Sequence, residues 1–268
     1  MPFRRRPDCF KAGGMTDADL LALATRLARS AAEAILSVRA AGFAIEQKTD
    51  MSPVTAADRL AEGIILEGLR AATPDIPVVA EEECSAGAIP QVGGRFWSVD
   101  PLDGTREFAA GREEFTVNIG LVVQGRPYLG AVALPAFGEV FTGIVGQGAW
   151  KQDAAGHRPI SARRAPEEGI TVFASRHYAG DPRLAEFLRD RRVAKVHEIG
   201  SAVKFCRLAE GVGDLYPRFG RTMEWDTAAP EAVLVAGGGR CTAMDGTTPL
   251  AYGKPGWENP PFLCQGRP

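Results

Sequence analysis

Residues 96–105, with the sequence FWSVDPLDGT, constrain the fold more than any other part of the chain. An apolar run ends there in two aspartates, Asp100 and Asp103. Pro101 has no N–H to donate to a neighbouring strand, so we predict that the strand ends and the chain turns directly after Asp100. Gly104 lets the backbone approach a ligand closely. A short helix beginning next would point its free N–H groups toward an anion.

Two carboxylates beside an anion site predict a phosphate-binding metal centre. Carboxylates are hard oxygen donors, and Mg²⁺ is normally shared between such donors and the phosphate oxygens of a substrate. The alternative is an Asp-Pro turn that closes a strand, because Asp and Pro are favoured in any surface turn. Taken alone, the stretch leaves both interpretations open.

Composition indicates a soluble globular protein with no global attraction to nucleic acid. The 268 residues suffice for one layered domain or two halves. With 31 basic and 33 acidic side chains the net charge is −2, so any phosphate-binding charge must be local. The five cysteines are scattered and include no CxxC pair, which predicts neither a disulfide framework nor a zinc site and fits a reducing cytoplasm. No apolar run is long enough to span a membrane.

The first half of the chain is predicted to be helix followed by antiparallel sheet. Apolar residues recur at helical spacing over residues 16–41, and a second helix capped by Thr55 is expected to run to about residue 69, with Asp58 in its first turn. A short strand at 77–80 leads into three adjacent acids that begin with Glu81. Three strands with short connections are expected at 115–123, 128–134 and 139–145.

The second half alternates strand and helix. Helices are predicted at 181–189, 201–210 and 225–236, and strands at 171–174, 193–197, 214–216 and near residues 241 and 250. Glycines cluster at 146–156, which predicts the seam between the halves. We therefore expect a disordered tail at 1–14, an α+β half at 15–148 with the metal site, and an α/β half at 149–268 with substrate-recognition residues. The whole is predicted to be a layered α/β sandwich with two sheets.

Five carboxylates stand at strand ends or helix starts, namely Asp58, Glu81, Asp100, Asp103 and Asp226. Such a cluster would repel itself unless cations filled it, which predicts two or three Mg²⁺ ions. One ion would activate a water and another would stabilise the leaving oxygen of a phosphoryl displacement. Helix capping or the helix dipole would explain individual acids equally well.

Two further groups are candidates for this centre. Thr105, together with Asp58, would orient the attacking water, and the Leu102 carbonyl would complete the metal coordination. The sequence does not support a triad hydrolase or a P-loop NTPase, because the three histidines are isolated and neither a GxSxG nor a Walker A pattern is present.

Several motifs resemble those of a known family. The acid pair at 81–82 and three longer segments carry the resemblance: SPVTAAD at 52–58, DPLDGT at 100–105 and WDTAA at 225–229. Together they are similar to the inositol monophosphatase superfamily of Mg²⁺-dependent, lithium-sensitive phosphatases, over residues 16–262. The resemblance implies the layered α-β-α-β-α sandwich that this superfamily shares with fructose-1,6-bisphosphatase.

Within that superfamily the chain most resembles the bacterial 3'(2'),5'-bisphosphate nucleotidases. The segments involved are REFAAGREEFTVNIGLV at 106–122, GSAVKFCRLAEG at 200–211 and LYPRFG at 215–220. The resemblance implies metal ligands at Glu81, Asp100, Leu102, Asp103 and Asp226, and catalytic roles for Asp58, Thr105 and Glu81. It also implies substrate contacts from Asp103, Gly104, Thr105, Ser201, Lys204, Arg218 and Asp226. For Ser201, Lys204 and Arg218 the alternative is that they bind no phosphate and belong to an ordinary helix face and, in the case of Arg218, to the protein surface. The segment 174–177 is one residue shorter than the family pattern, which leaves the role of His177 open.

The hypothesis from sequence is a cytoplasmic Mg²⁺-dependent phosphomonoesterase. It would remove the 3'-phosphate from adenosine 3',5'-bisphosphate to give AMP, and from the sulfated relative of that nucleotide, in sulfur metabolism. The alternatives are an inositol-1-monophosphatase, a broad-specificity phosphatase that also accepts fructose 1,6-bisphosphate, and a non-catalytic binding protein of the same fold. A homodimer and peripheral association with the cytoplasmic side of the inner membrane are further alternatives.

Overall fold

The computed structural model describes residues 14–47, 53–176 and 180–268. The helices are α1 (Asp17–Ala41), α2 (Ala56–Ala72), α3 (Glu81–Ser85), α4 (Thr105–Ala109), α5 (Pro182–Leu188), α6 (Val203–Ala209) and α7 (Glu224–Ala236), with a 3-10 turn η1 (Pro135–Phe137). Residues 1–13 of the tail predicted at 1–14 lie outside the described residues, as do Ser52, His177 and the side chain of Thr55.

Two large sheets organise the chain. The seven-stranded sheet has the sequential order β3 (Val78–Ala80), β4 (Arg95–Asp103), β5 (Thr116–Val123), β6 (Arg126–Leu134), β7 (Glu139–Ile144), β8 (Gly148–Asp153) and β9 (Gly156–Ile160). The five-stranded sheet has the order β11 (Val193–Ile199), β10 (Ile170–Ser175), β12 (Leu215–Arg218), β16 (Phe262–Gln265) and β14 (Arg240–Ala243). Two small pairs are β1 (Ile45–Gln47) with β2 (Pro53–Thr55), and β13 (Thr222–Met223) with β15 (Glu258–Asn259).

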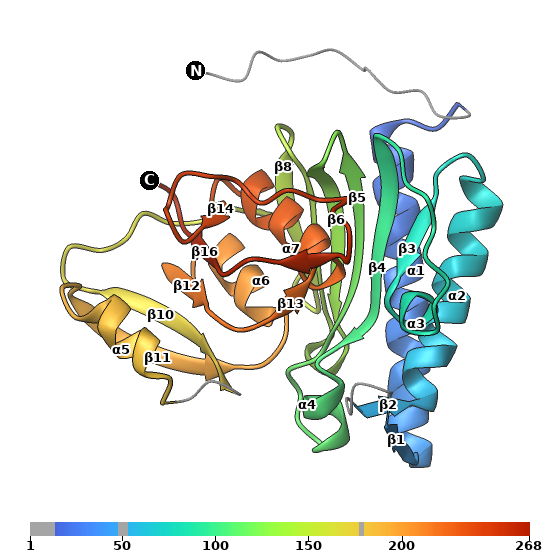
Figure 1. Ribbon diagram of the computed structural model, residues 1–268, viewed down its shortest axis with the longest axis horizontal. Coiled ribbons are helices and arrows are strands. Elements are labelled where there is room, and N and C mark those ends of the chain that lie inside the picture. Colours follow the sequence, from blue (N-terminus) through green and yellow to red (C-terminus); the bar gives the residue numbers. More distant parts are fainter. Residues whose placement is uncertain (1–13, 48–52, 177–179) are drawn as a thin grey trace.

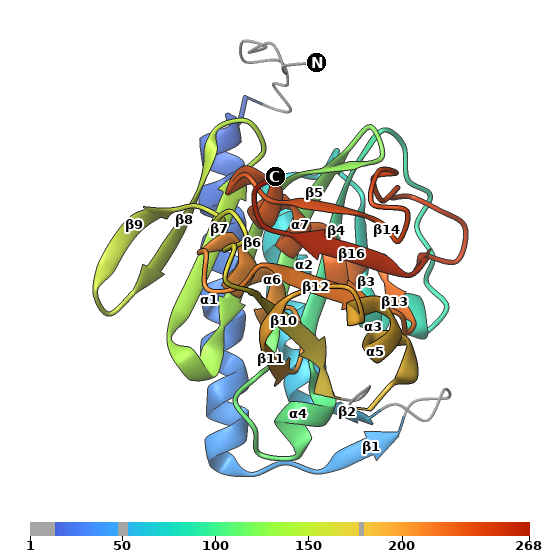
Figure 2. The ribbon, with the colours of Figure 1, turned by 90° about the vertical axis from the view of Figure 1, so that its left-hand side faces the viewer.

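The elements stack in five layers. Helices α1 and α2 cover one face of the seven-stranded sheet, and α6 and α7 lie between that sheet and the five-stranded sheet (Figure 1). Helix α5 covers the far face of the five-stranded sheet, where Phe187 and Leu188 pack against Val172. Figure 2 shows the five-stranded sheet in front of the seven-stranded one. The predicted α-β-α-β-α sandwich is confirmed. No helix in the described part of the chain has the length and apolarity that crossing a membrane requires.

The first helix begins and ends as its sequence predicts. Thr16 caps α1, since its hydroxyl accepts from the Asp19 N–H and the Asp19 carboxylate accepts from the Thr16 N–H. The buried residues of α1 follow the apolar spacing, and Gly42 ends the helix. Helix α2 continues to Ala72, three residues beyond the predicted end.

The predicted turn directly after Asp100 is wrong, because β4 runs through Pro101 to Asp103. Its pairing with β5 shifts between Asp100, opposite Asn118, and Asp103, opposite Thr116. The other neighbour, β3, pairs with β4 only as far as Val99. A register shift and an unpaired edge are the places where a strand tolerates a residue without an N–H. The strand therefore delivers both carboxylates, separated by a local irregularity.

The predicted seam and one predicted strand need correction. The boundary expected between residues 148 and 149 falls at the first residue of β8, and β8 and β9 continue the seven-stranded sheet. No strand forms at Leu250, where the nearest pairing is an isolated bridge between Thr242 and Pro249. Instead the strand β16, not predicted, lies between β12 and β14 and joins them. Its four residues follow two prolines and carry too little pattern to be recognised from sequence.

Helix α7 lies unusually close to the seven-stranded sheet because glycines face it. A methyl group added at Gly130 would stand 2.2 Å from the Ala229 carbonyl oxygen, and one added at Gly120 would stand 2.7 Å from the Ala229 nitrogen. Backbone therefore touches backbone with no side chain between them. This contact fixes the position of the first turn of α7, which carries Asp226.

Candidate active site

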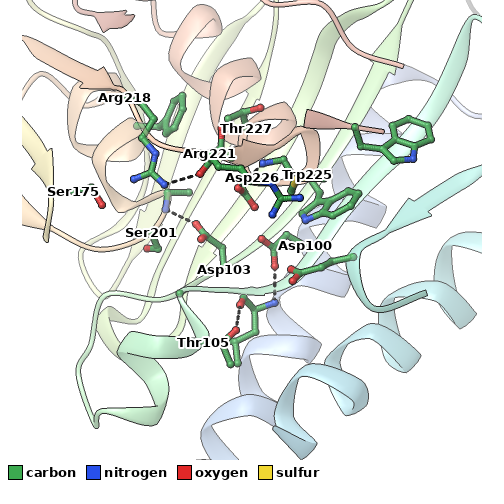
Figure 3. A pocket seen from close by; sticks show the side chains of 18 of the residues that line it. Asp100, Asp103, Thr105, Ser175, Ser201, Arg218, Arg221, Trp225, Asp226 and Thr227 are labelled. Carbon is green, nitrogen blue, oxygen red and sulfur yellow. Dashed lines mark hydrogen bonds between the residues drawn. The ribbon is translucent and has the colours of Figure 1, made fainter. Parts of the chain in front are cut away.

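A cavity of about 680 Å³ lies where the predicted site residues meet. It is lined by the end of β4, the starts of α3, α4, α6 and α7, and part of β12. In Figure 3 the carboxylates of Asp100, Asp103 and Asp226 turn toward one another in this cavity. Residues from distant parts of the sequence therefore converge as predicted.

Three carboxylates form the centre of the cavity. One oxygen from each of Asp100, Asp103 and Asp226 lies within 4.8 Å of the others. Backbone N–H groups hold all three side chains: Leu102 donates to Asp100 at 3.0 Å, Ala202 to Asp103 at 2.5 Å, and Met223 to Asp226 at 2.8 Å. The strand β4, the turn before α6 and the start of α7 thus preorganise the acids in one place.

The electrostatics of the cluster favour a cation. Burial, together with the nearby charges of Glu81 and Asp103, raises the pKa of Asp100 well above its ordinary value. Burial likewise raises the pKa of Asp103 to about 6 and that of Asp226 to about 7. A divalent ion between these groups would offset the free-energy cost of ionising them.

The donors around the cluster suit Mg²⁺. Glu81, the first residue of α3, also lines the cavity, as does Leu102. Carboxylate oxygens and a backbone carbonyl are the hard donors that Mg²⁺ binds. No histidine or cysteine belongs to the three-acid cluster, so its donor set does not suggest zinc. The residues present fit the predicted metal.

A second pair of predicted residues meets beside the acids. The Thr105 hydroxyl lies 3.1 Å from a carboxylate oxygen of Asp58 and 3.1 Å from the Leu102 carbonyl oxygen. Asp58 is buried on α2, and Thr105 opens α4 after Gly104, whose φ is 94°. A methyl group at Gly104 would stand 2.9 Å from the Glu114 carbonyl oxygen, so glycine is required there.

The cationic residues predicted for a second phosphate also line the cavity. Lys204 is buried, and its ammonium donates to the carbonyls of Ile199 at 3.0 Å and of Ser201 at 2.5 Å. Burial lowers the pKa of Lys204 to about 7. Arg218 donates to the Arg221 carbonyl at 3.0 Å. In Figure 3 Arg218 and Ser201 lie on the side of Asp103 away from Asp100.

Some cavity residues were not predicted from the sequence. Arg221, Trp225 and Thr227 line the same cavity. Arg221 falls between the segments 215–220 and 225–229, so its position between two site motifs was the available signal.

The comparisons with known proteins agree with this geometry. Residues 17–262 match the model of the inositol monophosphatase family. The chain belongs to that family. A family member from Salmonella typhimurium, named 3'(2'),5'-bisphosphate nucleotidase CysQ, is 43% identical over 239 residues, which cover 88% of this chain and 96% of the relative. The relative of the same name from Escherichia coli strain K12 is 42% identical over 85% of this chain and 91% of its own length.

Solved structures of family members show the same fold. The structure of CysQ from Bacteroides thetaiotaomicron has a TM-score of 0.77 and 31% identity, with 93% of this chain and 97% of that chain covered. An inositol monophosphatase from Anabaena has a TM-score of 0.74 and 28% identity, with 93% of this chain and 91% of that chain covered. The family resemblance predicted from the motifs is confirmed.

The raised pKa values predict how the metal-free protein responds to pH. Folding raises the pKa of Asp103 to about 6, of Asp226 to about 7 and of Glu231 to about 8, so the native state binds more protons than the unfolded chain above about pH 4. We expect the melting temperature in chelator to fall by roughly 5 °C or more between pH 4.5 and 7. Saturating Mg²⁺ should flatten this slope. A melting temperature that rises over this interval in chelator would contradict the assignment of these groups.

Proposed function

We propose that the protein is a Mg²⁺-dependent phosphomonoesterase that removes the 3'-phosphate from adenosine 3',5'-bisphosphate to give AMP, and from its sulfated relative, in the cytoplasm. The observation that carries the proposal is one cavity with two different poles, a carboxylate cluster and a cationic wall with Lys204 and Arg218. A bisphosphate needs both, since one phosphate is cleaved at the metals and the other must be held away from them. The relatives named as 3'(2'),5'-bisphosphate nucleotidases support this substrate.

Glu81, Asp100, Asp103, Asp226 and the Leu102 carbonyl would hold two or three Mg²⁺ ions. When bound, these ions supply the positive charge that lowers the pKa of a water molecule and stabilises a leaving oxygen. The acids contribute by being fixed before substrate arrives, because their backbone N–H partners already set their orientation.

Thr105 and Asp58 would orient the attacking water. When the Thr105 hydroxyl donates to the Asp58 carboxylate, its lone pairs are left to accept a hydrogen bond from that water. Because the hydroxyl has a single proton, donation to Asp58 and donation to the Leu102 carbonyl exclude each other. Donation to Asp58 therefore leaves the Leu102 carbonyl oxygen without this hydrogen bond.

The second phosphate would be held by Ser201, Lys204 and Arg218. Lys204 donates two of its three hydrogen bonds to backbone carbonyls and so fixes the turn at Ser201, where φ is +47°. Its third donor and the Arg218 guanidinium would then face the phosphate. Lys204 thus both shapes this wall and contributes charge to it.

Replacing Thr105 with valine tests the water-positioning role. Valine keeps the shape of threonine but cannot accept from or donate to a water molecule. We expect kcat to fall about 100-fold, with the Mg²⁺ dissociation constant unchanged within twofold, as measured by steady-state rates and by calorimetric Mg²⁺ titration. Equal kcat values for the variant and the wild type would remove Thr105 from the mechanism.

Initial rates on three substrates decide between this function and its alternatives. Adenosine 3',5'-bisphosphate is expected to give the highest kcat/KM, ahead of inositol 1-phosphate and fructose 1,6-bisphosphate. A preference above tenfold for either sugar phosphate would overturn the nucleotidase proposal, and no hydrolysis of any of them would favour the binding protein. A homodimer and peripheral contact with the inner membrane stay predictions.

A further inference from the structure

Glu62 is a buried carboxylate on α2 that the proposed mechanism does not use. It is 5% exposed and does not line the cavity. Its two oxygens accept separate backbone hydrogen bonds, from the Glu82 N–H at 2.9 Å and from the Glu83 N–H at 3.0 Å. Both oxygens of the side chain are therefore directed at the first turn of α3.

Helix α3 depends on this partner because it lacks a cap of its own. Its N-cap residue, Ala80, makes no side-chain cap hydrogen bond, and no helix carbonyl can accept from the N–H groups of the first turn. Three adjacent acids open the helix, so placing the buried Glu62 carboxylate beside them is electrostatically unfavourable. The two backbone hydrogen bonds that Glu62 accepts offset that cost. The first residue of the segment so held is Glu81, which reaches into the cavity.

The same helix face supports the other half of the site. Glu62 follows Asp58 by four residues, which places both side chains on one face of α2. Asp58 holds Thr105 while Glu62 holds the backbone next to Glu81. Figure 1 shows α3 packed beside α2.

We infer that Glu62 is a positioning residue that fixes the place of Glu81 and thereby sets the affinity of the metal centre. The inference rests on the proposed role of Glu81 as a ligand. A group that orients a metal ligand through a hydrogen bond typically contributes 10- to 100-fold in metal affinity. Glu62 acts through the backbone of α3, since both its oxygens accept from backbone N–H groups and the side chain does not line the cavity.

A second contact between α2 and α3 provides a matched control. Arg70 of α2 donates to the Glu83 carboxylate at 2.7 Å, in an ion pair whose side chains are 53% and 31% exposed. If Glu62 only docked one helix on the other, removing Arg70 would have a similar effect on the metal.

The test is a calorimetric Mg²⁺ titration of the full chain without substrate, for wild type, Glu62→Gln, Glu62→Asp, Arg70→Gln and Glu67→Gln. Glu62→Gln keeps the size but offers only one acceptor, and we expect its Mg²⁺ dissociation constant to rise about 10-fold or more. Glu62→Asp should raise it less. Arg70→Gln and the exposed Glu67→Gln should change it by less than twofold. At saturating Mg²⁺ the kcat of Glu62→Gln should recover to within about threefold of the wild-type value.

Three results would overturn the inference. The first is a Mg²⁺ dissociation constant of Glu62→Gln within twofold of wild type, and the second is an equal loss of Mg²⁺ affinity in Arg70→Gln. The third is a kcat of Glu62→Gln that saturating Mg²⁺ does not restore. Should Glu62→Gln fail to fold, Glu62→Asp carries the same test. Because binding is measured without substrate, failure of the nucleotidase proposal remains distinguishable. In that case the wild type would bind Mg²⁺ and fail to hydrolyse adenosine 3',5'-bisphosphate.

Discussion

Asp100→Asn is expected to lower kcat/KM by about 10³-fold or more while making the metal-free protein more stable. Asp100 lies at the centre of the carboxylate cluster, and replacing it removes one negative charge and one anionic donor from the proposed metal site. A thousandfold loss corresponds to ~4 kcal/mol of transition-state stabilisation, and a bound metal ion supplies several kcal/mol of this kind.

The expected gain in stability of the metal-free protein comes from relieving repulsion between buried charges. Burial and the charges of Glu81, Asp103 and Asp226 penalise ionised Asp100, whose pKa is raised for that reason. The asparagine carbonyl can still accept from the Leu102 N–H, so the local backbone is retained. We expect a higher melting temperature than wild type in chelator at pH 8, and a lower one in saturating Mg²⁺.

The exposed Asp75 supplies the control for this prediction, since Asp75→Asn removes an equal charge from a position that does not line the cavity. It should leave both the rate and the two melting temperatures near the wild-type values. Retained turnover in Asp100→Asn would remove Asp100 from the mechanism. A lower melting temperature of Asp100→Asn in chelator would contradict the proposed repulsion between Asp100 and the neighbouring carboxylates.

Gly130→Ala is expected to destabilise the protein by about 3 kcal/mol and to lower kcat about 100-fold. The added methyl group would meet the Ala229 carbonyl oxygen at 2.2 Å and two further backbone atoms of Ala229 at 2.9 Å. Backbone atoms cannot swing aside as a flexible side chain would, so α7 must move away from β6. That movement displaces Asp226 from the other acids, and a shift near 1 Å is enough to cost this much rate.

Gly63→Ala makes the same chemical change where nothing lies within 4 Å of the new methyl group. Gly63 is exposed within α2, so alanine should raise the free energy of unfolding by up to ~1 kcal/mol. Urea unfolding and steady-state rates of both variants measure the contrast. A Gly130→Ala protein as stable and active as wild type would contradict the close contact between α7 and the sheet.

Local sequence patterns predicted the long helices, and they singled out acids that the structure gathers in one cavity. The capping residue Thr16 and the apolar spacing after it are enough to predict α1 from the local sequence. The motif at 100–105 identified Asp100 and Asp103, because acids flanked by proline and glycine carry a chemical meaning in the sequence itself.

Features that depend on tertiary pairing were missed. Strand β4 continues past Pro101 because its register against β5 shifts there. No residue of the strand predicts this shift. Strand β16 exists because β12 and β14 flank it. Nothing in the sequence singles out Glu62, since its partners are backbone N–H groups some 20 residues away.

The proposed Mg²⁺-dependent hydrolysis is tested most directly by measuring phosphate release from adenosine 3',5'-bisphosphate by chelator-treated protein during a Mg²⁺ titration. We predict no hydrolysis in chelator and saturable formation of AMP as Mg²⁺ is added, because the clustered acids need the ions before the site can act on an ester. Hydrolysis that continues unchanged in chelator, or its absence at every Mg²⁺ concentration from a folded protein, would contradict it.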